Sequence, residues 1–421
     1  MNGAVLPILH VEVSLKSSTT ASITGIETSI RDHLKSSNLV VSENGSLEVV
    51  SFKEDPFLSS CIDAITVFSE EKESLSDGGV RVSEASLRIY TFELDEHGSS
   101  YENMNDESEN PTPADVHWML PSAELHHQWE SLIYDDDIKS KLLNFAHTAL
   151  RFSDKGVDPN KISWNRVVLL HGPPGTGKTS LCRALAHKLS IRMGSRYTHG
   201  QLVEINSHSL FSKWFSESGK LVHQMFEKIR EMVEDSDALV CVLIDEVESL
   251  ATSRKSGGTE PGDALRVVNA MLTALDSIKQ YPNVVIFTTS NITGSIDNAF
   301  VDRADIKHYT GHPSKNAIYQ ILQISIEELM NKGIVELQEK CLPLSSYKIY
   351  RNESSRLLMT VAESCEGLSG RTLKKLPFLA ASAMFRKYNS PNCLIKLTDF
   401  LDAIAPSVKE QHLENNNLTK C

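Results

Sequence analysis

The sequence lacks long hydrophobic runs and paired cysteines. No apolar stretch reaches the roughly 18 to 20 residues that a membrane-spanning helix needs, and residues 1–10 lack the basic segment of a secretory signal peptide. The seven cysteines are scattered without a Cys-x-x-Cys pair, which argues against a disulfide framework and a zinc knuckle. We therefore expect reduced, buried thiols in a soluble protein of the cytosol or nucleus, with no membrane partner.

Basic residues are missing from one long stretch of the chain. Residues 89–138 contain no Lys or Arg. The thirteen Asp and Glu residues in this window equal the whole excess of 55 acids over 42 bases, so the net charge of −13 is local. Because proteins that bind duplex DNA or RNA usually present a broad basic face, this distribution predicts no direct binding to nucleic acid.

A small mixed α/β domain is predicted for residues 1–95. Its alternating apolar stretches at 8–13 and 87–92 are typical of strands, and residues 24–34 have a helical pattern. This region shows no catalytic constellation. Residues 96–121 are polar, acidic and contain proline, and we interpret them as a mobile, solvated linker. The alternative is that this run of charge is a binding tail.

Residues 122–313 alternate helical patterns with short apolar runs. This alternation predicts an α/β fold with a parallel sheet covered by helices on both faces. The apolar runs that predict its strands are Val167–Leu170, Leu202–Asn206, Leu239–Ile244 and Val284–Thr288. Residues 314–410 are predicted to form a helical domain, with helices near 316–330, 357–365, 372–387 and 397–404. Residues 411–421 are expected to be a frayed tail.

A glycine-rich motif lies between the first of these strands and a helical pattern. It consists of Gly172, Pro173, Pro174, Gly175, Thr176, Gly177, Lys178 and Thr179, and Ser180 continues into the helix. Its glycines allow backbone N–H groups to turn toward phosphates, Lys178 can reach the β and γ oxygens, and the Thr179 hydroxyl can ligate Mg²⁺. The positive N-terminal end of the helix favours the same phosphates. The alternative is a simple Gly-rich turn. Because a strand precedes the motif and a helix follows it, as in phosphate-binding loops, the motif predicts a nucleoside triphosphate site.

Two further apolar strands end in polar residues. Asp245 and Glu246 follow one of them, where Asp245 is placed to hold the Mg²⁺ shell and Glu246 to orient and polarise an attacking water. Asn291 follows the other, and its amide could complete the hydrogen bonding of that water. The alternatives are an Asp-Glu pair that caps a helix and a turn residue that only ends a strand.

The order and spacing of these motifs over residues 128–313 resemble the AAA+ ATPases. That resemblance implies a helical lid after the nucleotide domain, a hexameric ring, and an arginine from a neighbouring subunit that completes each site. Arg303 is the arginine-finger candidate, although protein-remodelling relatives carry two arginines in this stretch, which is shorter here. Arg371, at the start of a lid helix, resembles the second sensor that contacts the γ-phosphate. The simpler roles are a surface salt bridge for Arg303 and a solvated residue at a capped helix for Arg371.

An aromatic segment falls where such ATPases project a loop into the central pore. Lys213, Trp214 and Phe215 lie among polar residues, and flat rings contact any extended backbone with little demand on its sequence. The alternative is a buried Trp that anchors the sheet. Residues 254–263, Gly-rich and charged, match a second pore loop, and an ordinary surface loop explains them equally well.

The amino-acid sequence at residues 171–182, 210–220 and 302–307 resembles the pachytene checkpoint protein 2 family, and the resemblance covers residues 120–405. It implies a homohexameric ATPase, with ATP and Mg²⁺ as cofactors, that partly unfolds HORMA-domain proteins. The implied substrates are meiotic chromosome-axis proteins and a spindle-checkpoint protein that a HORMA-like adaptor presents. It also implies an N-terminal domain that recruits substrate or adaptor, and a location in the nucleus, on chromosomes and in the cytoplasm.

Two other functions share parts of this pattern. A nucleic-acid-directed motor or clamp loader has the same fold and the second-sensor arginine, but basic pore loops or a basic appended domain are expected there. A nucleotide-switched scaffold would assemble without remodelling any substrate. The complete set of Lys178, Asp245 and Glu246 argues against the scaffold.

Overall fold

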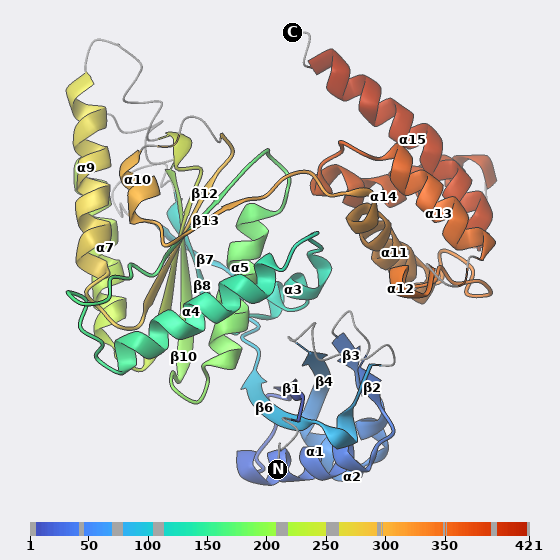
Figure 1. Ribbon diagram of the computed structural model, residues 1–421, viewed down its shortest axis with the longest axis horizontal. Helices are drawn as coiled ribbons and strands as arrows, with labels where there is room; N and C mark the ends of the chain where they lie inside the picture. The colour runs from blue at the N-terminus through green and yellow to red at the C-terminus, as the bar shows by residue number, and fades with distance from the viewer. Residues whose placement is uncertain are drawn as a thin grey trace.

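The computed structural model describes residues 6–41, 46–69, 79–103, 113–207, 218–249, 261–292, 296, 298–347, 350, 352–388 and 394–418. These residues form an N-terminal domain, a central domain built on a large sheet, and a C-terminal helical domain (Figure 1). None of the helices within these ranges is both long and apolar enough to cross a membrane.

The N-terminal domain is a four-stranded sheet that carries two helices on one face (Figure 1). The strand order is β3, β4, β1, β6, with β1 parallel to β6 and antiparallel to β4. The elements are β1 (Ile8–Leu15), α1 (Ile23–Ser36), β3 (Ser46–Glu48), α2 (Pro56–Cys61), β4 (Ile62–Ser69) and β6 (Ser86–Glu93). A separate ribbon pairs β2 (Val40–Val41) with β5 (Val80–Arg81). Single-turn 3₁₀ helices span Ser51–Glu54, Val82–Glu84 and, after this domain, Ala123–Leu125.

The sequence pattern explains this small domain. The Ser22 side chain begins α1 by accepting a hydrogen bond from the backbone N–H of Gly25, and Ile26, Ile30 and Leu34 are buried at helical spacing. The odd-numbered residues of β1 pack in the same hydrophobic cluster, so its even-numbered residues lie on the opposite face of the sheet. The predicted strands at 8–13 and 87–92 and the predicted helix at 24–34 are confirmed.

The central domain is built on a seven-stranded, mostly parallel sheet. The strand order is β13, β9, β12, β11, β10, β8, β7, and the first five strands run parallel to one another. The strands are β7 (Ser100–Asn103), β8 (Pro113–Leu120), β9 (Val167–His171), β10 (His199–Asn206), β11 (Ala238–Asp245), β12 (Val284–Ser290) and β13 (Ile306–Tyr309). The parallel sheet predicted from four apolar runs is therefore confirmed, and β13 extends it at one edge.

The other edge of the sheet corrects the linker prediction. Residues 96–121 are predicted to be a mobile linker, but β7 and β8 within this range are antiparallel strands of the central sheet. Trp118 and Leu120 of β8 lie opposite Leu202 and Gly200 of β10, and both β8 side chains are buried. The linker prediction is wrong here because the acidic composition of the segment obscured a short alternation of apolar residues.

Helices cover both faces of the central sheet, as the sequence predicts. They are α3 (Gln128–Ser131), α4 (Ile138–Asp154) and α5 (Lys178–Arg192) on one face, and α7 (Ser218–Glu234), α9 (Pro261–Ile278) and α10 (Asn298–Arg303) on the other. In β9, Val168 and Leu170 belong to the first core, whereas Val167 and Leu169 belong to the second. Because successive strand residues point to opposite faces, a strand covered on both faces is continuously apolar.

The C-terminal domain is a helical bundle with its own core. Its helices are α11 (Lys315–Asn331), α12 (Leu344–Tyr347), α13 (Glu353–Ser364), α14 (Gly370–Tyr388) and α15 (Leu397–Leu418). The predicted helices are thus confirmed, but the frayed tail predicted for residues 411–421 is wrong up to Leu418. His412 explains part of this order, because its Nε2 lies 3.0 Å from the carbonyl oxygen of Ser364 on α13. Residues 419–421 lie outside the described ranges.

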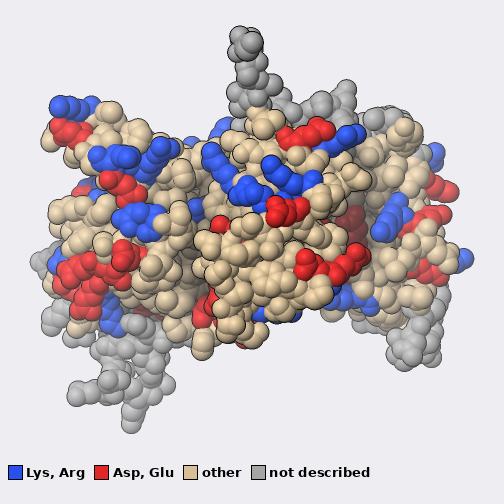
Figure 2. Space-filling model, turned by 90° about the horizontal axis from the view of Figure 1, so that it is seen from below, with Lys and Arg blue, Asp and Glu red and all other residues tan. Residues whose placement is uncertain are grey.

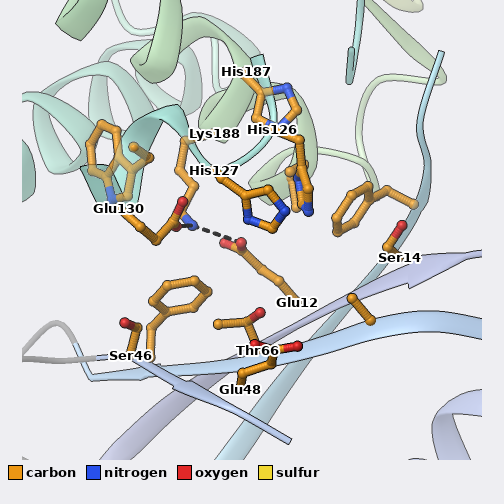
Figure 3. Close-up of a pocket in the computed structure, with 15 residues that line it drawn as sticks. Glu12, Ser14, Ser46, Glu48, Thr66, His126, His127, Glu130, His187 and Lys188 are labelled. Atoms are coloured by element: carbon orange, nitrogen blue, oxygen red, sulfur yellow. Dashed lines mark hydrogen bonds and ion pairs between the residues drawn. The ribbon is translucent and has the colours of Figure 1, made fainter. Parts of the chain in front are cut away.

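A buried ion-pair cluster joins β1 of the N-terminal domain to α5 of the central domain. Glu12, 6% exposed, accepts hydrogen bonds from Lys188 Nζ at 2.7 Å and from Arg192 Nε at 2.9 Å. Lys188 Nζ also lies 3.7 Å from the centre of the Phe68 ring. In Figure 3, Glu12 points from the N-terminal sheet toward Lys188 on the helix above it. Glu130 also accepts a hydrogen bond from Lys188 Nζ at 3.2 Å, so two carboxylates face the two buried cations of this cluster.

A cavity of about 170 Å³ lies beside this ion-pair cluster, and three histidine rings line it. His126, His127 and His187 line the cavity together with Glu12 (Figure 3). His187 Nδ1 accepts a hydrogen bond from the backbone N–H of Ser122 at 3.2 Å, and burial lowers the pKa of His187 to about 3. The His187 ring is therefore neutral in the folded protein, because a protonated Nδ1 has no lone pair with which to accept this bond.

We predict that Glu12→Gln weakens the docking of the N-terminal domain. The substitution removes the carboxylate that both Lys188 and Arg192 contact, while Glu130 still accepts a hydrogen bond from Lys188. Breaking a buried ion pair in this way costs about 3 to 5 kcal/mol. Hydrogen exchange should rise in β1 and at the C-terminal end of α5. Glu84→Gln, which removes only an exposed ion pair with Arg81, is the matched control. Equal exchange in the two variants would contradict the docking role of Glu12.

Candidate nucleotide site

The glycine-rich segment 172–179 connects the carboxyl end of β9 to the first turn of α5. Its glycines have positive φ angles of 142° at Gly172, 76° at Gly175 and 89° at Gly177, a conformation that a side chain would strain. A Cβ on Gly172 would lie 2.2 Å from the carbonyl oxygen of Thr310. The segment therefore forms a tight loop at the N-terminus of a helix, which is a geometry that favours phosphate groups.

Lys178 lies inside this loop and is 4% exposed. Its Nζ donates to the carbonyl oxygens of Gly172 at 2.9 Å and Pro173 at 2.8 Å. Burial lowers the pKa of Lys178, whereas the carboxylates of Glu248 and Asp245 oppose this shift. The ammonium group is thus held where phosphate oxygens would enter the loop. The remaining residues of the motif complete the loop and the first turn of α5: Pro174, Thr176 and Ser180.

The carboxyl ends of β11 and β12 bring the predicted polar residues to the start of α5. Asp245 Oδ1 accepts a hydrogen bond from Thr179 Oγ1 at 2.9 Å and another from Thr289 Oγ1. Glu246 follows with a positive φ of 59°, and its Oε1 accepts a hydrogen bond from Asn291 Nδ2 at 3.3 Å. The structure therefore brings Thr179, Asp245, Glu246 and Asn291 together, and their catalytic roles stay predictions.

The oxygen atoms beside Thr179 suit Mg²⁺ that is held jointly with phosphates. In proteins Mg²⁺ keeps several waters and is usually bound through one or two carboxylates plus the phosphates of a substrate. Thr179 and Asp245 supply a hydroxyl and a carboxylate oxygen that are 2.9 Å apart. Across the part of the chain that the structure describes, no group of three or more His, Cys, Asp or Glu residues could hold a metal by itself. The residues present therefore fit a metal that arrives with a nucleotide.

The helical domain contacts the phosphate loop through the start of α14. The backbone N–H of Arg371 donates to the carbonyl oxygen of Gly175 at 3.0 Å. Ser369 caps α14, because its side chain accepts a hydrogen bond from the backbone N–H of Thr372 at 3.2 Å. A Cβ added to Gly175 would lie 2.8 Å from the Oγ of Ser369. Burial is the main cause of the lowered pKa of Lys178, and the charge of Arg371 adds to it. The backbone of Arg371 therefore lies beside the loop, and its action as the second sensor stays a prediction.

Sequence reasoning missed a cavity beside the loop. Its volume is about 220 Å³, and its lining includes Tyr134, Asp136, Thr176, the segment 308–313 and Gly370. Tyr134 Oη donates to the carbonyl oxygen of the loop residue at position 177 at 3.1 Å. The cavity suits the base of a nucleotide whose phosphates lie in the loop. No local motif marks it, because its lining comes from several segments that are far apart in the sequence.

A buried carboxylate was missed as well. Glu248, 8% exposed, accepts a hydrogen bond from the backbone N–H of Asn291 at 3.0 Å. Burial is the dominant cause of the lowered pKa of Lys178, and among the groups that raise this pKa the charge of Glu248 has the largest effect. The sequence offered no signal for this contact, because an acidic residue two positions after Glu246 is also typical of an exposed helix start.

Arg303 lies at the end of α10 in a two-point ion pair with Asp276 of α9. Its Nε donates to Asp276 Oδ1 at 3.0 Å and its Nη2 to Oδ2 at 2.7 Å, while its Nη1 donates to the carbonyl oxygen of Ala299 at 2.9 Å. These contacts hold Arg303 on the α9 and α10 side of the sheet in its own chain. Its action as an arginine finger on a neighbour stays a prediction. The predicted pore-loop residues Lys213, Trp214 and Phe215 lie outside the described ranges. Most of the second predicted loop, at 254–263, lies outside them as well.

Comparison with known proteins indicates one family along the whole chain. Three family profiles match in order: the TRIP13 N-terminal domain at residues 4–97, the ATPase family associated with various cellular activities (AAA) at 168–312, and the TRIP13-like AAA+ ATPase lid C-terminal domain at 314–412. The pachytene checkpoint protein 2 homolog of Gallus gallus is 51% identical over 421 residues, which cover 98% of this chain and 95% of that protein. The chain belongs to the pachytene checkpoint protein 2 family.

Solved structures agree with this membership. The structure of C. elegans PCH-2 has a TM-score of 0.79 to this chain and is 35% identical, covering 96% of this chain and 99% of that one. A chain of the E. coli MS115-1 HORMA:CdnC:Trip13 complex has a TM-score of 0.52 at 15% identity, covering 70% of this chain and 94% of that one, which shows a shared fold. The predicted AAA+ fold with a helical lid and a small N-terminal α/β domain is confirmed, and the protein is an ATPase of this family.

We predict that Gly172→Ala lowers the affinity for ATP by more than about tenfold, a change of about 1.4 kcal/mol in binding free energy. The new Cβ would meet a backbone oxygen of Thr310, so the loop itself must shift. Titration with a fluorescent ATP analogue measures the affinity. Gly156→Ala is the control, because Gly156 also has a positive φ, of 61°, but nothing lies within 4 Å of its added Cβ. If the two variants bind ATP equally well, the close approach to Thr310 does not matter for binding.

Proposed function

We propose that this protein is a homohexameric ATPase that uses ATP to partly unfold HORMA-domain proteins. The observation that carries the proposal is a phosphate loop with Asp245 and Glu246 beside it, combined with the family's own N-terminal and lid domains over nearly the whole chain. The E. coli structure, in which Trip13 occurs together with HORMA and CdnC, supports HORMA-domain proteins as the class of partner.

Each residue of the site has a role in hydrolysis under this proposal. Lys178 and the loop N–H groups hold the β and γ phosphates of ATP. Thr179 and Asp245 hold the Mg²⁺ that accompanies ATP, and this ion would neutralise charge on the phosphates. Glu246, whose carboxylate is held by Asn291, orients and polarises the attacking water.

Two arginines link hydrolysis to other parts of the ring. Arg303 acts in trans and stabilises charge on the γ-phosphate bound by the adjacent subunit. To do so, its side chain must break its ion pair with Asp276 or contact Asp276 and the phosphate together. Arg371 contacts the γ-phosphate of its own subunit from α14, so that the angle of the lid follows the nucleotide state. The backbone contact between Arg371 and Gly175 supports this second role.

Substrate handling involves parts of the chain outside the nucleotide site. Residues Lys213, Trp214 and Phe215 grip an extended substrate segment in the central pore, and the N-terminal domain recruits the substrate or a HORMA-like adaptor. The proposed substrates are meiotic chromosome-axis proteins and a spindle-checkpoint protein, which places the activity in the nucleus, on chromosomes and in the cytoplasm. Direct contact with nucleic acid or membrane is not part of this proposal.

The two alternative functions receive less support. A nucleic-acid-directed motor or clamp loader needs a basic surface, but basic and acidic side chains are interspersed on the face drawn in Figure 2. A scaffold that only switches with nucleotide has no need of a positioned water-activating group. In this protein Glu246 and Asn291 are already joined beside Asp245.

We predict that Glu246→Gln stops ATP turnover while ATP binding and ring assembly persist. The amide cannot polarise the attacking water, so turnover should fall by about 100-fold or more. Phosphate release, titration with a fluorescent ATP analogue and sedimentation velocity measure the three properties. Glu366→Gln, on the exposed surface of the lid, is the control that should behave as the wild type. Normal turnover in Glu246→Gln would refute the role assigned to Glu246. Stable capture of proteins without a HORMA domain by the ATP-bound Glu246→Gln variant would refute the proposed substrate class.

We predict that Trp214→Ala leaves ATP binding intact but abolishes the opening of a purified HORMA-domain protein. The indole supplies contact area to the substrate and none to the nucleotide. Protease sensitivity of the HORMA substrate, with ATP present, reports its opening. Phe378→Ala removes a lid aromatic that is 73% exposed and is the matched control. Opening that survives in Trp214→Ala would make Trp214 a core residue.

A further inference from the structure

A threonine at the end of β12 contacts both acidic residues of the nucleotide site. Thr289 is 1% exposed. Its Oγ1 donates to Asp245 Oδ1 and accepts a hydrogen bond from the backbone N–H of Glu246 at 3.3 Å. Its carbonyl oxygen accepts a hydrogen bond from the backbone N–H of Val247 at 3.0 Å. One residue therefore bonds three successive residues at the end of β11.

The preceding threonine has a different environment. Thr288 is 2% exposed, but its Oγ1 donates to the carbonyl oxygen of Val168 in β9 at 3.0 Å. Thr288 lies opposite Ile244 in the paired register of β11 and β12. Because successive strand side chains point to opposite faces, the two adjacent hydroxyl groups serve different partners. Thr288 supports the sheet, whereas Thr289 contacts the site.

Nucleotide binding would increase the importance of Thr289. Thr179 and Thr289 both donate to the same oxygen of Asp245. Thr179 is the hydroxyl that suits Mg²⁺, so Thr289 is the hydroxyl that continues to hold the carboxylate. Groups that orient a metal ligand in this way typically contribute about 10- to 100-fold to metal affinity or activity.

The same threonine supports the backbone of Glu246. The φ of Glu246 is 59°, a left-handed conformation that is uncommon for a residue with a side chain. The surrounding contacts must therefore stabilise it. Thr289 holds the N–H groups of Glu246 and Val247, while Asn291 holds the Glu246 carboxylate.

We propose that Thr289 is a positioning residue for ATP hydrolysis, whose hydroxyl orients Asp245 and stabilises the backbone turn that presents Glu246. This inference rests on the ATPase activity of the family and deepens the account of the same site. It adds a residue to which no sequence motif assigned a role.

The test compares Thr289→Ala with Thr289→Ser in the full-length protein. Alanine removes the hydroxyl, whereas serine keeps it and removes only the methyl group. We expect Thr289→Ala to lower kcat by about tenfold or more, and to reduce the gain in affinity for a fluorescent ATP analogue that Mg²⁺ provides. Affinity for the analogue in EDTA should stay unchanged. Thr289→Ser should restore both kcat and the Mg²⁺-dependent affinity to within about threefold of the wild type.

Thr288→Ala is the matched control, because it removes an adjacent buried hydroxyl that bonds only within the sheet. It should lower the unfolding midpoint but keep the Mg²⁺ dependence of binding. Equal impairment of Thr289→Ala and Thr289→Ser would overturn the proposal, since methyl packing would then explain the loss. The same Mg²⁺ defect in Thr288→Ala would also overturn it. Absence of ATP hydrolysis in the wild type is a separate outcome, which would refute the ATPase function itself.

Discussion

The compensation of buried charges on α5 is the constraint on which the rest of the structure depends. This helix is covered on nearly all sides, and three of its basic residues are buried: Lys178, Lys188 and Arg192. A buried charge is tolerated only when it is paired and hydrogen-bonded. Lys178 is held by carbonyl groups of the phosphate loop, and the other two share Glu12 from the N-terminal domain. The half-buried Arg183 forms a two-point pair with Glu204, both distances being 2.7 Å.

The same helix therefore connects the chemistry of the site to the rest of the chain. Lys178 and Lys188 are separated by ten residues, about 15 Å along an α-helix. The phosphate loop lies at one end, where Arg371 of the lid also binds Gly175. The N-terminal domain docks toward the other end through Glu12. All three domains thus contact one loop and helix.

Much of this arrangement could be predicted because its signals are local. The apolar run at Val167–Leu170 predicts a strand covered on both faces, and the motif that follows it predicts a phosphate loop. Asp245 and Glu246 were found because they end a second strand of the same kind. The segment around Trp118 was missed because its acidic neighbours suggested a linker, although the strand pairs with β10. The continuation of the last helix to Leu418 was missed, and a frayed tail was predicted instead, because the order of this helix depends partly on a contact between residues 412 and 364.

The sequence by itself determined which chemical groups are available and which elements carry them: a phosphate loop before a helix, an acidic pair after a strand, and helices for the lid. Only the tertiary structure decided that Thr289 holds Asp245, that Arg371 lies on Gly175, and that Glu12 pairs with the far end of α5. The physical reason is that hydrogen bonds and buried ion pairs depend on separations of about 3 Å between atoms. Such separations between residues far apart in the chain are set by the order and packing of strands and helices, which a local pattern does not contain.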